Sequence, residues 1–241
     1  KIIEEEKSPA GPIIRFVNRV AGEFPDKVIS TLAYQYSRPA PVKTKPRSNV
    51  QVMLCTIELN RSKPITTDPA SISFLKDMED WGKISNHIYL WDYTVNFNHH
   101  ITPFPNIHTL KPNIQLFVEN HVREHFQQSN TGTAHEFSEL KSYLIAKLLW
   151  NPDADVQKII REFTDGYYGP AGKWIRKYIS ALEKEILKTG EWLDIYGPPT
   201  QHQHTFLSVE NVALYNHYFD KAEKAVMNQP GYLLHVQTAR M

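Results

Sequence analysis

The stretch from His87 to His100, which reads HIYLWDYTVNFNHH, constrains the fold more than any other part of the sequence. Its residues 88–91 are apolar or aromatic without a break, which is typical of a strand that is covered on both faces. Asp92 then begins a polar segment, and Pro103 and Pro105 end regular structure. Barrel and open-sheet α/β enzymes build their sites where a buried strand ends in such polar groups, so the stretch predicts a site.

Three further segments share this pattern of an apolar run with polar or aromatic residues at its end. They cover residues 27–36, 50–58 and 122–128. Helical patterns lie beside them, at residues 8–22, 72–84, 112–120 and 136–150. Strands that alternate with helices predict parallel βα units, and therefore the α/β fold class.

Beyond residue 151 the sequence shows helical patterns and no strand pattern. We therefore expect two domains, a β/α domain over residues 1–150 and an all-helical domain over residues 151–241. Four βα units are half of what a (β/α)8 barrel needs, so we expect either the C-terminal half of such a barrel or a small open sheet. The chain begins abruptly and ends in what looks like the middle of a helix, so we expect both ends to be cut from a longer protein.

Composition excludes several classes of function. The 241 residues carry a formal net charge of +1, and no basic stripe indicates nucleic acid as a partner. No apolar run reaches the roughly 18 residues of a membrane span. The single cysteine, Cys55, lies in an apolar run and is expected to be a buried thiol. No GxSxG motif and no phosphate-binding glycine motif occurs, which disfavours hydrolase-fold esterases, nucleotide enzymes and Rossmann proteins. We expect no cofactor.

Two carboxylates lie where neighbouring strands of the predicted sheet end. Glu58 follows the second apolar run, and Asp92 follows the third. Glycosidases use a pair of carboxyl groups on opposite sides of the bond that they cleave, so these two are the candidate catalytic residues. The alternative is that each carboxylate caps a helix or pairs with an arginine.

Aromatic residues make up 12% of the chain, and several lie at the predicted strand ends. Sugar rings stack on aromatic faces while their hydroxyls need polar partners, so this pattern suits a carbohydrate cleft; core packing is the alternative. Alternation turns the side chains beside Asp92 away from it and puts the two tyrosines of the first strand on one face. The candidate substrate-binding residues are Tyr34, Tyr36, Trp91, Tyr93, Asn96 and His99.

Histidines raise the alternative of a metal site. His99 and His100 with Asp92, or His202 with His204, offer possible ligands. The sequence has no HExxH and no CxxC motif, and the second pair lies in a loop rich in glutamine and proline, where solvent exposure is the simpler interpretation. We therefore expect no metal site.

Several segments together resemble a bacterial family known as domain of unknown function 4838. The resemblance covers about residues 8 to 180 and is most specific in WDY at 91–93 and LLWNPDAD at 148–155. Other segments that carry it read AGPIIRFVNRV, FPDKVISTLAYQYSRPAP and LKPNIQLFVENHV.

The resemblance implies a glycoside-hydrolase-type (β/α)8 barrel, related in fold to α-glucuronidases and β-N-acetylhexosaminidases. It implies that this chain supplies barrel strands five to eight and part of a helical domain. It also implies a role in exported polysaccharide-degrading systems, and hence a periplasmic or extracellular location. One position departs from the family pattern: Gln127, in the segment FQQSN at 126–130, stands where a glutamate is expected.

Two functions are therefore expected. The first is a glycoside hydrolase that acts on a polysaccharide or glycan, with Glu58 and Asp92 in acid/base catalysis. The alternative is a non-catalytic barrel that binds carbohydrate, which the amide of Gln127 favours. In both cases the expected partner is a carbohydrate, with neither nucleic acid nor a membrane span involved, and the oligomeric state is left open.

Overall fold

The computed structural model describes residues 1–129 and 135–241, and these form two compact units. The first unit contains residues 1–60, 65–93 and 115–128, and the second contains 61–64, 94–114 and the remainder of the chain from residue 129. Each unit is described by itself below. Because the chain passes between the units several times, the domain division predicted at residue 150 stays a prediction.

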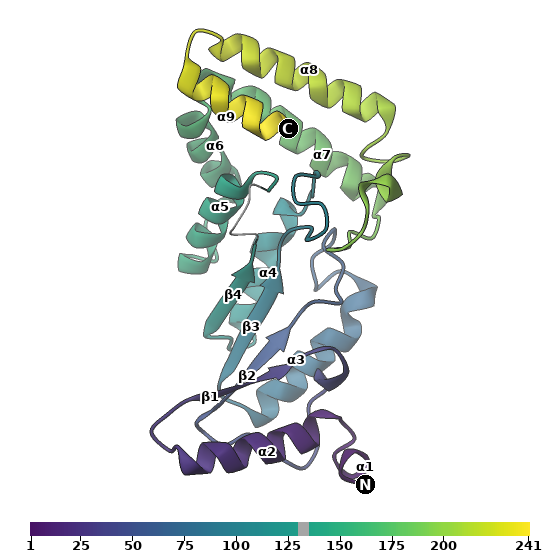
Figure 1. Cartoon of the computed structure of the whole chain (residues 1–241), viewed down its shortest axis with the longest axis vertical. Coiled ribbons are helices and arrows are strands. Elements are labelled where there is room, and N and C mark those ends of the chain that lie inside the picture. Colours follow the sequence, from purple (N-terminus) through teal and green to yellow (C-terminus); the bar gives the residue numbers. More distant parts are fainter. Residues whose placement is uncertain (130–134) are drawn as a thin grey trace. The chain divides into compact units, whose positions relative to one another are not determined.

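The first unit is built on a parallel sheet of four strands. The strands are β1 (Ile29–Ala33), β2 (Val50–Cys55), β3 (Ile88–Tyr93) and β4 (Glu124–Gln128). They lie in chain order, β1-β2-β3-β4, and every neighbouring pair is parallel (Figure 1). The predicted α/β class and the four predicted strand segments are therefore confirmed.

Helices precede and connect the strands. Helices α1 (Ile2–Glu6) and α2 (Ala10–Glu23) come before β1, and α3 (Ile72–Ile84) connects β2 to β3. Helix α4 (Ile107–Glu119) connects β3 to β4. The sequence predicted that it starts at Pro112, but in the structure it starts five residues earlier. The backbone N–H and hydroxyl of Thr109 both donate to the carbonyl of Asn106, which supports this extra turn upstream of Pro112. The segment between β1 and β2 is a proline-rich loop that contains one short 3₁₀ helix, η1 (Gln35–Ser37).

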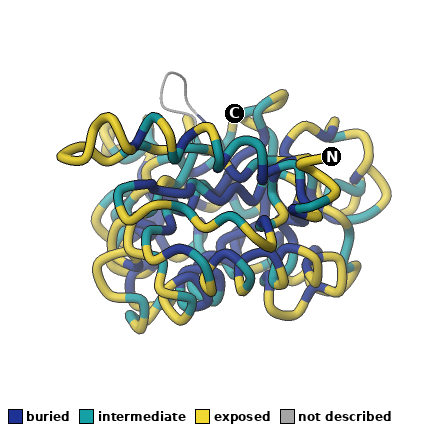
Figure 2. The backbone as a smooth tube through the Cα atoms, turned by 90° about the horizontal axis from the view of Figure 1, so that it is seen from below, coloured by how far each residue is buried: buried dark blue, intermediate teal, exposed yellow. Residues whose placement is uncertain are grey.

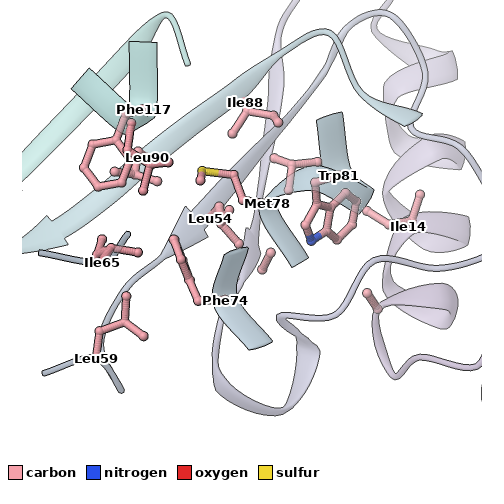
Figure 3. Close-up of a cluster of buried hydrophobic side chains, with 14 residues drawn as sticks. Ile14, Leu54, Leu59, Ile65, Phe74, Met78, Trp81, Ile88, Leu90 and Phe117 are labelled. Atoms are coloured by element: carbon pink, nitrogen blue, oxygen red, sulfur yellow. The ribbon is translucent and has the colours of Figure 1, made fainter. Parts of the chain in front are cut away.

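One face of the sheet forms the core of the first unit. Because side chains alternate along a strand, Leu54 of β2 and Leu90 of β3 point to the same side. There they pack in a cluster with Phe74, Met78 and Trp81 of α3 (Figure 3). The same cluster reaches Ile14 of α2 and Phe117 of α4. We call this side the core face.

The opposite face of the sheet, here called the second face, is aromatic and only partly buried. Its residues alternate with those of the core face, and they include Leu32, Met53, Tyr89, Trp91 and Phe126. Leu32 and Phe126 are exposed, and Tyr89 and Trp91 are half-buried. Figure 2 shows buried segments in dark blue and exposed segments in yellow along the backbone. The sheet thus presents large apolar side chains on both faces, as the unbroken apolar run in β3 predicted.

A buried carboxylate fastens the N-terminal helices to the loop that follows β1. The side chain of Glu6 is fully buried and accepts hydrogen bonds from Arg15 Nη2 at 2.5 Å and Thr44 Oγ1 at 2.5 Å. The backbone N–H groups of Lys43 and Thr44 also donate to it, each at 3.0 Å. Burial by itself would raise the pKa of Glu6, but these hydrogen bonds outweigh burial and lower the pKa to about 2.

We predict that Glu6→Gln lowers the free energy of unfolding by about 2 kcal/mol at neutral pH, because a charged acceptor of five hydrogen bonds is lost. In the wild type this contribution is present above pH 4.5 and is lost as the pH falls towards 2. Urea unfolding across this range measures both effects. Glu4→Gln, on the exposed side of the same helix, is the control, and equal unfolding of the two variants would contradict the prediction.

The described residues of the second unit form helices and loops. Its helices are α5 (Ser138–Trp150), α6 (Val156–Tyr167), α7 (Gly172–Thr189), α8 (Val209–Val226) and α9 (Pro230–Arg240), with 3₁₀ helices η3 (Gly169–Ala171) and η4 (Pro199–His202). From residue 151 onward the structure contains no strand, as the sequence predicted. Among the described residues, no helix is long and apolar enough to cross a membrane.

Two titratable groups of the second unit are buried against one another. His108 Nδ1 of α4 lies 3.8 Å from Glu183 Oε1 of α7. Burial raises the pKa of Glu183 to about 7, and burial also lowers the pKa of His108. Glu136 raises the Glu183 pKa further and Lys141 opposes it. The folded unit therefore favours the neutral form of both groups.

Because the pKa of Glu183 is raised on folding, its stabilising contribution is complete below pH 4.5 and disappears as the pH rises through about 7. We predict that Glu183→Gln, which is neutral at every pH, makes the protein more stable than the wild type by about 2 kcal/mol near pH 8 and changes little near pH 4.5. Urea unfolding at the two pH values measures this. Glu185→Gln on the same helix is the control, and a gain that is the same at both pH values would contradict the assignment.

Candidate functional site

Asp92 lies at the end of β3 in a row of polar side chains that crosses three strand ends. It is only 3% exposed. Its Oδ1 accepts a hydrogen bond from Thr56 Oγ1 at 2.6 Å, and its Oδ2 accepts one from Gln127 Nε2 of β4 at 3.1 Å. Asp92 and Gln127 are register partners, and alternation puts both on the core face. The carboxylate is thus held in place by neutral donors from its two neighbouring segments.

The amide of Gln127 joins this row to a histidine. Its Nε2 lies 3.0 Å from His125 Nε2, and because an amide nitrogen only donates, the imidazole nitrogen accepts. Burial lowers the pKa of His125, partly offset by the charge of Asp92, so the ring is neutral as an acceptor requires. Gln127 is the position where the sequence resemblance led us to expect a glutamate, and its amide contacts Asp92. Asn130 of the same motif lies outside the described residues.

Glu58 lies in the turn after β2 and pairs with an arginine. Its Oε2 is 3.2 Å from Arg38 Nη1, and its side chain is 38% exposed. The Nε of Arg38 donates to Asp77 Oδ2 at 2.7 Å, and its Nη2 donates to Ser73 Oγ at 3.0 Å. The arginine therefore ties Glu58 to helix α3. This is the arginine pairing that the sequence left open as the alternative, whereas Asp92 is bound by different partners on the core face.

An aromatic cluster lies at the C-terminal end of the second face. The rings of Trp91 and Tyr93 are stacked, with centroids 5.9 Å apart and planes at 16°, and Phe126 of β4 lies 5.3 Å from Trp91. Trp91 Nε1 donates a hydrogen bond to Gln128 Oε1 at 2.7 Å, which fixes the indole. Phe126 is 40% exposed. The sequence predicted Trp91 and Tyr93 as site residues but missed Phe126 and Gln128, although their alternation in the last strand was visible.

The two tyrosines after β1 do not continue the strand. The strand ends at Ala33, and Gln35 has a φ of 46°, so the alternation that would have put Tyr34 and Tyr36 on one face stops between them. The predicted strand boundary at residue 36 was wrong for this reason. Tyr34 is half-buried and Tyr36 is exposed. Their role in binding stays a prediction.

Asn96 and His99 lie in the second unit and form a turn. Asn96 Oδ1 accepts from the backbone N–H groups of Asn98 at 3.0 Å and His99 at 2.9 Å. Asn96 Nδ2 donates to the carbonyl of Gly197 at 2.8 Å. These contacts give Asn96 a clear structural role, and the side chain of His99 is exposed. A role of either residue in binding stays a prediction.

Two of the three remaining candidates, Cys55 and His202, are buried. Cys55 is fully buried, as expected, and burial raises the pKa of its thiol to about 12, which removes it as a nucleophile at neutral pH. His202 was expected in solvent but is buried, with its Nδ1 2.9 Å from Glu191 Oε2, because η4 folds its loop. His204 is exposed. Within the described part of the chain, no cluster of three or more histidine, cysteine or acidic residues is arranged to hold a metal ion.

We predict that Gln127→Glu makes stability fall with rising pH, because it places a second carboxyl group about 3 Å from Asp92, and two such groups cannot both ionise without cost. The expected loss relative to the wild type is about 2 kcal/mol near pH 8 and much less near pH 4.5. Gln128→Glu adds the same charge to the second face of the same strand and is the control. Identical pH dependence of unfolding in the two variants would show that Asp92 and residue 127 are not coupled.

Comparison with known families gives a match over most of the chain. The model of a family described as Domain of unknown function (DUF4838) matches residues 1–180, which include all four strands and helices α1 to α6. The matched segment is about three quarters of the chain. No curated protein and no solved structure matches the sequence.

Proposed function

The chain belongs to the family described as Domain of unknown function (DUF4838), and from this premise we propose that it forms half of a (β/α)8 barrel that hydrolyses glycosidic bonds in a carbohydrate. The strand arrangement supports the barrel. In a (β/α)8 barrel each strand pairs in parallel with the next strand along the chain, and β1 to β4 follow this order without exception. The second face of the sheet then corresponds to the barrel interior.

The observation that carries the proposal is the aromatic cluster at the strand ends. Sites in such barrels lie at the C-terminal ends of the strands, which is where Trp91, Tyr93 and Phe126 gather. Aromatic faces bind the C–H faces of sugar rings, and the exposed Phe126 offers such a face beside Gln128, whose amide can bond hydroxyl groups. This combination supports carbohydrate as the substrate class.

We assign the reacting carboxylate to Glu58. It is partly exposed, so a substrate can reach it, and its pairing with Arg38 fixes its orientation. Glycoside hydrolysis uses two carboxyl groups, and Asp92 was the expected second one. Because Asp92 is buried between Thr56 and Gln127, we now assign it a positioning role at the ends of β2, β3 and β4. A carbohydrate polymer as substrate is consistent with a periplasmic or extracellular location, which we include in the proposal.

A non-catalytic carbohydrate-binding barrel is the second candidate. The observation that favours it is the amide of Gln127, which donates to Asp92 at the position where the resemblance led us to expect a glutamate. An amide can donate a hydrogen bond but cannot deliver a proton to a leaving group. If that glutamate is the proton donor in relatives, this chain has the aromatic cluster for binding but lacks the proton donor for hydrolysis.

We predict that the full-length protein binds a subset of polysaccharides and hydrolyses the corresponding aryl glycosides. Phe126→Ala should weaken binding about three- to tenfold through the lost stacking face. Glu58→Gln should lower turnover at least about a hundredfold while binding persists. Affinity electrophoresis on a polysaccharide panel and release of the aryl group measure the two quantities.

Phe16→Ala is the matched control, because Phe16 is also an exposed phenylalanine but lies on α2. Binding without any turnover in the wild type would favour the second candidate. No binding to any polysaccharide, or equal effects of the two phenylalanine variants, would overturn the proposed site.

A further inference from the structure

The second unit contains a small pocket that the proposed function does not use. It lies between Ile101, the start of α5, the end of α6 and helix α9, and all of its lining residues belong to this unit. Its volume is about 60 Å³, which gives room for about four water molecules or an organic molecule of similar size. The residues that matter for its chemistry are His135, Glu136, Glu139, Tyr167, Tyr168 and His235.

Two buried residues present unpaired polar atoms at this pocket. His135 is 6% exposed, and its Nδ1 lies 3.2 Å from the carbonyl of Glu136. A carbonyl only accepts, so Nδ1 carries the proton and Nε2 is an acceptor, with no partner among the described residues. Tyr168 is 2% exposed, and its hydroxyl likewise has no partner in the described part of the chain. Neither atom belongs to the fully buried polar atoms that lack a partner, and both residues line the pocket, so a ligand in the pocket can reach the two atoms.

A second histidine adds another acceptor. His235 of α9 stacks on Tyr167 at a centroid distance of 3.8 Å with the planes at 5°. Its Nδ1 donates to the carbonyl of Tyr167 at 2.7 Å, so its Nε2 is also an acceptor. The rings of Tyr167 and Tyr168 meet at 84° with centroids 5.0 Å apart. The pocket therefore combines imidazole acceptors with aromatic walls.

The charges around the pocket are mainly negative. Glu139, in the first turn of α5, is exposed and lines the pocket. Next to burial, its charge contributes to the raised pKa of both Tyr167 and Tyr168, which shows that its field reaches the rings. Glu136 is neutralised by the buried Lys141, whose Nζ lies 2.7 Å from Glu136 Oε2. Burial lowers the pKa of His135, and so does the charge of Lys141, so this imidazole is neutral at neutral pH.

We propose that this pocket binds the protonated amino group of a small amine. An ammonium group has three N–H donors and a positive charge. It matches the two Nε2 acceptors, the carboxylate of Glu139 and the electron-rich faces of the tyrosines. A neutral alcohol of equal size lacks the charge, and an anion would meet Glu139. The inference is independent of the carbohydrate site, because it rests only on residues of the second unit.

The test compares ethanolamine with ethylene glycol, which has the same number of heavy atoms and no charge. Imidazole ¹⁵N resonances of the full chain report directly on the two Nε2 atoms. We expect a saturable shift of the His135 and His235 resonances with ethanolamine, and at least about tenfold weaker binding of ethylene glycol. Before ligand is added, both rings should show the tautomer with the proton on Nδ1.

Variants separate the pocket from general charge effects. Glu139→Gln should weaken ethanolamine binding at least about fivefold, and Tyr168→Phe, which keeps the ring, about threefold. Glu210→Gln is the matched control, because Glu210 is also in the first turn of a helix but lies on α8, outside the pocket lining. Thermal unfolding verifies that each variant is folded. Equal binding of the two probes, no saturable shift, or the same effect of Glu139→Gln and Glu210→Gln would each overturn the proposal.

Discussion

The alternation of side chains along one parallel sheet organises the first unit. In β3, Ile88 and Leu90 pack on the helices, while Tyr89, Trp91 and Tyr93 point to the second face. A shift of one residue in strand pairing would exchange the two sets, so the aliphatic core and the aromatic cluster depend on the same register. The core thereby fixes the site: the packing of Leu90 under α3 and α4 determines where Trp91 meets Phe126 across the pair β3–β4.

Two carboxylates, Glu6 and Glu183, show how neighbouring groups decide whether the pKa of an acid rises or falls when it is removed from solvent. Glu6 has an arginine, a threonine and two backbone donors, and its pKa falls to about 2 in spite of complete burial. Glu183 faces a histidine that burial itself keeps neutral, and its pKa rises to about 7. Asp92 accepts hydrogen bonds from neutral donors, among them the Thr56 hydroxyl just after β2 and the Gln127 amide of β4. All three are carboxylates largely removed from solvent, and their hydrogen-bond donors and charged neighbours come mainly from segments distant in sequence.

Features that depend on neighbouring residues could be predicted from the sequence, whereas contacts between residues far apart in the chain could not. The four strands, the fold class and the helical second half followed from local apolar periodicity, and Trp91 and Asp92 followed from the polar end of one run. The hydrogen-bond partners of these side chains could not be predicted, because they lie far away in the sequence. Arg38 and Glu58 are 20 residues apart, and Asn96 and Gly197 are 101 residues apart. The loop after β1 was misjudged for a backbone reason, the positive φ of Gln35, which no apolar pattern reports. Phe126 could have been predicted from the sequence, because alternation in EHFQQ places it on the opposite face of the strand from Gln127.

The amide of Gln127 limits which reactions the residues at the strand ends can catalyse. Hydrolysis of a glycosidic bond needs a group that gives a proton to the leaving oxygen. Gln127 cannot do so, and Asp92 lies on the core face with its oxygens held by Thr56 and Gln127. Of the carboxylates at these strand ends considered for catalysis, Glu58 alone combines exposure with a fixed orientation. A hydrolase built on this sheet would therefore place one carboxyl at Glu58 and take its second from barrel strands other than β1 to β4, whereas a binding protein would need only the aromatic cluster.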